Sequence, residues 1–259
     1  DSVFCSFSKY NFDIRVPKLS AEKATVTYLG KIKEPVEGIF EFASQRHAGT
    51  EDARFPRFKS YRSDVSVNIY DKQQINPNRV SLTGGFSLVG NRVSSESYFE
   101  GETTVEVRET GGTKFKATSR RFGINDSLMV SSDASVVIYQ RKDSVYHPSV
   151  KFKYILDSSD LVLQTRKGDY KRTPFVSTFL KMDIRADMVQ WDLRTDSLEI
   201  STLTARDKVP VLFESQEYYN DELFTQLSQM YDFHPLIMAV SYARKTRSGT
   251  FYADDMAQA

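Results

Sequence analysis

Hydrophobic and polar residues alternate along most of the first 215 positions of the chain. The clearest runs are 24–29, 65–70, 80–83, 103–108 and 150–154. Alternation with a period of two places one set of side chains on each face of a sheet. Turn-forming residues separate the runs, so we expect short antiparallel strands.

Two glycine pairs carry different predictions. Gly111 and Gly112 lie between the alternating runs 105–108 and 114–118, which predicts a tight hairpin. Gly84 and Gly85 lie inside the apolar stretch 82–89, where a bulge or a close approach of another backbone is expected.

The pattern changes near residue 216. Asn220, followed by two acidic residues, is a good helix N-cap, and apolar residues then follow with helical spacing. Pro235 is suited to the first position of a second helix. We therefore expect a β domain over residues 1–215 and a helical C-terminal cap over 216–259.

Internal similarity suggests a repeat. The segment SDVSVNIY at 63–70 resembles SDASVVIY at 132–139, with six of eight positions identical. A weaker echo joins 13–15 to 183–185. These matches predict approximate units 11–100, 101–180 and 181–215, with 63–70 and 132–139 on equivalent strands. The expected fold is mainly β: an antiparallel, repeat-built β-sandwich or a curled, solenoid-like sheet with a C-terminal α-helical cap.

Composition restricts the possible partners. The formal net charge is +1 and no basic stripe stands out, so we expect no nucleic-acid partner. Neither a signal-peptide pattern nor an apolar run of about 18 residues occurs, so no transmembrane segment is expected. The start at Asp1 suggests a mature product or an excised fragment. The single cysteine, Cys5, and the β-repeat character favour a periplasmic or extracellular location.

Candidate catalytic chemistry is sparse. The three histidines lack partners at metal-binding or catalytic spacings, and no nucleophile or phosphate-binding motif occurs. We therefore predict a chain that is not an enzyme and that uses no cofactor or metal. One segment keeps an alternative open: Trp191 with Asp183 and Asp187 combines an aromatic ring with carboxylates, as carbohydrate-binding or carbohydrate-active sites do.

A second candidate is an aromatic and arginine-rich segment. It contains Arg54, Phe55, Arg57, Phe58 and Tyr61. Arginine and aromatic residues are enriched at binding hot spots, so this is a candidate interaction loop. The same residues can pack the flank of a sheet, with the arginine stems lying over it, and this interpretation is favoured.

Three functional classes follow. The first is a structural or protein-interaction β-repeat module, part of a larger cell-envelope or secreted protein, whose partner is another protein or a neighbouring domain. The second is a β-groove that binds a lipid or another apolar ligand. The third is a glycan-binding or glycan-active domain. A module predicts an exposed apolar patch where a neighbouring unit docks.

Overall fold

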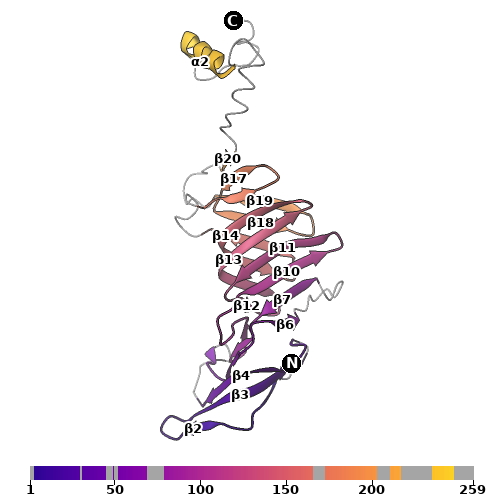
Figure 1. The fold of residues 1–259 in the computed structure, drawn as a ribbon, viewed down its shortest axis with the longest axis vertical. Helices are drawn as coiled ribbons and strands as arrows, with labels where there is room; N and C mark the ends of the chain where they lie inside the picture. Colours follow the sequence, from indigo (N-terminus) through magenta and orange to yellow (C-terminus); the bar gives the residue numbers. More distant parts are fainter. Residues whose placement is uncertain are drawn as a thin grey trace. The chain divides into compact units, whose positions relative to one another are not determined.

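The computed structural model describes residues 3–29, 31–44, 49, 52–68, 79–165, 173–202, 211–216 and 235–247. The chain forms two compact units, Asp1–Glu214 and Ser215–Ala259. The first unit consists of antiparallel β-strands, and the described part of the second contains a short helix. The predicted mainly β class is therefore confirmed (Figure 1).

Strand pairing divides the first unit into two layers. The first layer contains, in pairing order, β2 (Asn11–Asp13), the first half of β3 (Lys18–Tyr28), the second half of β4 (Val36–Ala43), β5 (Arg57–Ser60), β8 (Ser87–Val89), β9 (Arg92–Ser94), β12 (Gly123–Ile124), the first half of β13 (Leu128–Gln140), the second half of β14 (Asp143–Ile155), β15 (Asp160–Gln164), β18 (Met188–Asp192) and β19 (Ser197–Ser201).

The second layer runs alongside and shares the long strands. It contains β1 (Val3–Ser6), the second half of β3, the first half of β4, β6 (Val65–Asn68), β7 (Val80–Gly84), β10 (Thr103–Glu109), β11 (Gly112–Ser119), the second half of β13, the first half of β14, β16 (Phe175–Ser177), β17 (Met182–Arg185) and β20 (Leu212–Ser215). A bridge between Ile32 and Val67 continues this layer from the β3–β4 turn to β6.

Two long hairpins pass from one layer to the other. The register of β3 against β4 shifts between Ala21 and Ala24, and that of β13 against β14 shifts between Ser131 and Ala134. Such irregularities bend strands. Each hairpin therefore contributes one half to each layer and joins the layers covalently.

The core lies between the layers and is continuous. It extends from Ala21 to Leu193 as one cluster of buried apolar residues. Phe115 of the second layer contacts Phe152 and Tyr154 of the first, with ring centroids 6.0 and 5.2 Å apart. Because hydrophobic and polar residues alternate within each strand, each layer has one apolar face, and the two apolar faces pack against each other.

Both glycine-pair predictions are confirmed. Strands β10 and β11 form a tight hairpin in which Glu109 pairs with Gly112, whose φ is +119°. A Cβ on Gly85 would lie 2.3 Å from the backbone nitrogen of Ser97, so the backbones approach closely there.

The predicted sequence repeat is not confirmed. Of segment 63–70, the structure describes residues 63–68, which contain β6, whereas 132–139 lies inside the crossing strand β13. These strands have different partners, because β6 pairs with β7 while β13 pairs with β11, β12 and β14. Likewise, residue 13 is the last residue of β2 and residues 14–15 lie in the turn after it, whereas 183–185 lie within β17. The three units proposed from these matches stay a prediction.

The described helix of the second unit is α2 (Pro235–Thr246). It begins at the proline where a helix was predicted, and Arg244 and Lys245 in its last turn complement the helix dipole. The helix predicted from Asn220 lies outside the described residues, and capping of the β unit stays a prediction.

Candidate functional site

The two-layer sheet is open at both ends. At one end, β1 and β2 each pair only with β3 among the described strands; we call these two strands the start edge. At the other end, and again among the described strands, β19 pairs only with β18 and β20 only with β17; we call these the end edge. No described strand pairs with the outer side of either edge, and a strand with an unpaired side is a template for strand addition.

The start edge is apolar and exposed. Phe4 on β1 is 60% exposed and Phe12 on β2 is 56% exposed. The turn between β2 and β3 adds Ile14 and Val16, also exposed. Exposed apolar side chains of this size on an edge are typical of an interaction surface.

The end edge is apolar as well. Leu198 on β19 and Leu212 and Phe213 on β20 are exposed. An ion pair of 2.6 Å between Arg185 and Glu214 holds β20 against β17. The hydroxyl of Ser201, at the end of β19, is buried and has no hydrogen-bond partner among the described residues.

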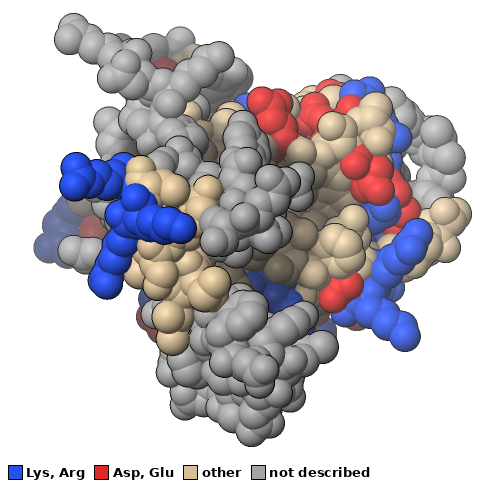
Figure 2. All heavy atoms as spheres, turned by 90° about the horizontal axis from the view of Figure 1, so that it is seen from above, with Lys and Arg blue, Asp and Glu red and all other residues tan. Residues whose placement is uncertain are grey.

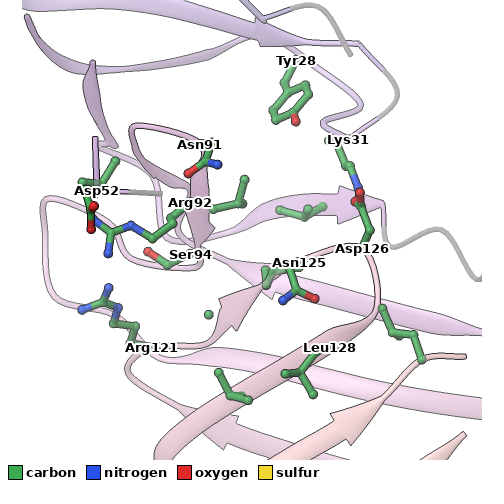
Figure 3. A pocket seen from close by; sticks show the side chains of 17 residues that line it. Tyr28, Lys31, Asp52, Asn91, Arg92, Ser94, Arg121, Asn125, Asp126 and Leu128 are labelled. Carbon is green, nitrogen blue, oxygen red and sulfur yellow. The ribbon is translucent and has the colours of Figure 1, made fainter. Parts of the chain in front are cut away.

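A cavity of about 790 Å³ lies near the junction of β9 and β12 (Figure 3). Its apolar lining comes from both strands and from their neighbours: Tyr28, Val67, Val89, Val93, Ile124, Leu128, Val130 and Leu156. Its charged side chains are gathered in two groups. Lys31 and Asp126 form an ion pair of 2.8 Å on one side, and Asp52, Arg92 and Arg121 lie together on the other.

The second polar group carries net positive charge. Arg121 makes one long ion pair, 3.9 Å, with Glu96, and no described residue lies within ion-pair distance of Arg92. Elsewhere, acidic and basic side chains mix on the face shown in Figure 2, and neither sign covers its described part. The cavity can therefore accommodate a molecule with an apolar body and an anionic group.

The structure separates the residues of the carbohydrate alternative. Trp191 lies on β18 in the first layer and is only 4% exposed, while Asp183 lies on β17 in the second layer. The Trp191 indole donates a hydrogen bond of 3.2 Å to Asp196, and the Lys114 ammonium lies 5.7 Å from its ring centre. Asp187 lies in the turn between the layers, where its carbonyl accepts a bond from Thr165. The indole thus packs in the core and presents no open face for a sugar ring.

The aromatic and arginine-rich segment divides between core and surface. Phe58 on β5 is buried, whereas Arg54 and Arg57 are exposed and joined by a bond from the Arg57 Nε to the Arg54 carbonyl. The Arg57 guanidinium lies 4.8 Å from the centre of the half-buried Phe55 ring. Tyr61 donates to the carbonyl of Glu22. Packing therefore accounts for most of this segment, and its role as an interaction loop stays a prediction.

An exposed aromatic cluster beside Tyr61 was not predicted from the sequence. Tyr98 and Phe99 lie 5.8 and 5.9 Å from the Tyr61 ring and are more than half exposed. Burial and the neighbouring carboxylates of Glu22 and Glu37 raise the pKa of Tyr61. The signal in the sequence is a consecutive aromatic pair in a polar loop.

The remaining reactive side chains have structural surroundings. His147 is buried on β14, where its Nδ1 accepts a bond from the Ser149 amide and its Nε2 donates to the Thr173 carbonyl. Cys5 is half-buried on β1, and burial raises the pKa of its thiol. In the described ranges, no group of three or more acidic, histidine or cysteine side chains could hold a metal ion.

No helix among the described segments has the length and apolar character needed to cross a membrane. Comparison with known proteins gives no relatives: no protein-family model, no curated protein and no solved structure matches this chain. Function is therefore inferred from the geometry of the two edges and of the cavity.

Proposed function

We propose that the chain is a non-catalytic structural or protein-interaction module that joins other β-sheet proteins through its open ends. The observation that supports this proposal is the pair of apolar edges, unpaired among the described strands, on a two-layer sheet with one continuous core. Proteins normally protect edge strands with charges, prolines or a covering element. An edge that carries Phe4 and Phe12 is instead suited to adding a strand from a partner.

Sedimentation velocity over a range of protein concentrations tests this proposal. We expect the wild type to self-associate as concentration rises, and Phe12→Lys to suppress that association by at least about tenfold, because a charge would be buried in the contact. Tyr146→Lys is the matched control, since Tyr146 is an exposed aromatic on β14, which has neighbours on both sides. A single monomeric boundary at every concentration, or equal effects of both variants, contradicts the proposal.

A second candidate function rests on the cavity. Its apolar lining and the Arg92 and Arg121 guanidinium groups favour binding of an amphiphile with an anionic head. Native mass spectrometry with a saturated fatty acid as the probe tests this idea. We expect one bound molecule that is lost in the double variant Arg92→Ala and Arg121→Ala. Binding that is unchanged in this variant rejects the cavity as the site.

A further inference from the structure

The pairing of the first ten strands recurs in the last ten. Strands β1 and β2 both pair with β3, and β11 and β12 both pair with β13. The hairpins β3–β4 and β13–β14 both cross between layers, with register shifts that follow Ala21 and Ser131. These two positions are therefore equivalent.

The recurrence continues along both layers. In the first layer, the series β4, β5, β8, β9 corresponds to β14, β15, β18, β19. In the second layer, β6, β7, β10 correspond to β16, β17, β20. Strands β1–β10 and β11–β20 thus have the same pairing order.

The chain itself shows how two such sets of strands join. Strand β12 pairs with β9, with Ile124 opposite Val93 and Gly123 opposite Ser94. Strand β11 pairs with β10, with Ala117 opposite Val105. The first two strands of one set therefore add to the last two strands of the set before it, and each layer continues across the junction.

The start edge and the end edge correspond to the two sides of this internal junction, but neither edge has the adjoining strands. Strands β1 and β2 correspond to β11 and β12, and β19 and β20 correspond to β9 and β10. We propose that the start edge of one molecule adds to the end edge of a second copy in the register of the internal junction. This inference rests on the proposed function and names the partner and the contact.

The register can be stated for β2 on β19. Phe12 lies opposite Leu19 as Ile124 lies opposite Met129, so Phe12 takes the place of Ile124. In the same way, Ile200 lies opposite Val189 as Val93 lies opposite Leu88. The contact therefore sets Phe12 opposite Ile200.

The next pair sets Asn11 opposite Ser201. In the internal junction, the corresponding pair is Gly123 and Ser94. The buried hydroxyl of Ser201 has no hydrogen-bond partner in the described part of the chain, and the addition brings a polar side chain to the strand position directly across from it. Since the joined surfaces differ, the association is head-to-tail and continues into an open series of copies.

Disulfide trapping tests the register. Residues directly opposite in an antiparallel pair have Cα atoms about 4.5–5.5 Å apart, within the range that a disulfide spans. In a Cys5→Ala background, we mix a protein carrying Asn11→Cys with one carrying Ser201→Cys under mild oxidation. The control replaces the second protein with Ser197→Cys, four residues away on the same strand, roughly 13 Å distant at about 3.3 Å per residue.

We expect the matched pair to give at least about tenfold more cross-linked dimer than the control pair. Emission of the buried Trp191 checks that each variant is folded. Equal yields from both pairs overturn the register while leaving association through the ends intact. No cross-linking from either pair at millimolar concentration overturns this inference, and the proposed function fails with it only if sedimentation velocity also gives a single monomeric boundary.

Discussion

Truncation of Phe115 to alanine measures how strongly the core couples the two layers. Phe115 is fully buried on β11 and contacts rings of the opposite layer. Loss of its apolar burial costs about 2–3 kcal/mol. A residual cavity of roughly 80 Å³ adds up to about 2 kcal/mol at about 24 cal/mol per Å³. We therefore expect Phe115→Ala to lower the free energy of unfolding by about 3–5 kcal/mol.

Urea unfolding followed by tryptophan emission is the assay. The chain has one tryptophan, Trp191, which is 4% exposed, so its emission reports on the β unit. With an m-value of about 2–3 kcal/mol per M, the midpoint should fall by about 1–2.5 M in one transition. Phe12→Ala is the control, with a loss below about 1 kcal/mol because Phe12 is 56% exposed. An unchanged midpoint, or separate transitions by emission and circular dichroism, would refute a single core that couples the layers.

Three further predictions concern backbone approach, edge charge and pH. Gly85→Ala should destabilise by about 1–3 kcal/mol in thermal melts because its Cβ meets backbone atoms, whereas Gly111→Ala, with open space around it, should be close to neutral. Glu199→Lys should strengthen self-association about two- to fivefold at low salt. The proposed register places residue 199 opposite Asp13, and opposite charges across strands contribute about 0.2–1 kcal/mol. Weaker association of this variant would count against that register. A hydrogen bond from a neighbouring arginine lowers the pKa of Glu106 below its ordinary 4.5, so its contribution is present above that pH and is lost as pH falls through the lowered value. That pair is exposed, so Glu106→Gln should remove less than about 1 kcal/mol at pH 7 and nothing near pH 2, and an equal loss at both would reject the ion pair as the cause.

The sequence was sufficient for the local features of the fold. Alternation predicted the strands, and the glycines at 111–112 predicted the hairpin, because both depend on neighbouring residues only. The crossing of β3 and β13 between layers could not be predicted in this way. It depends on bulges after Ala21 and Ser131, where two exposed residues follow each other and the alternation of buried residues shifts by one position.

The candidate sites show the same limit. Trp191 and Asp183 are close in sequence, but their strands belong to different layers. Proximity along the chain therefore did not predict that the two side chains share a site. The similarity of 63–70 to 132–139 is not accompanied by shared pairing, because β6 and β13 have different partners. In contrast, the apolar residues Ile14 and Val16 in a turn were a visible signal of an unburied surface, because turns are ordinarily polar.

The crossing hairpins also affect how such a structure can grow. A globular domain gains stability with size because its surface-to-volume ratio falls, and this gain stops when one core becomes too large. Here the thickness is fixed by two layers, and each hairpin such as β13–β14 closes its own length of core. Strands added to either edge would therefore extend the core along one direction at a constant cross-section, and each addition would contribute a similar stability. The number of strands in the two layers could then vary without a change in thickness, and only the apolar surface at the two ends would need protection from solvent.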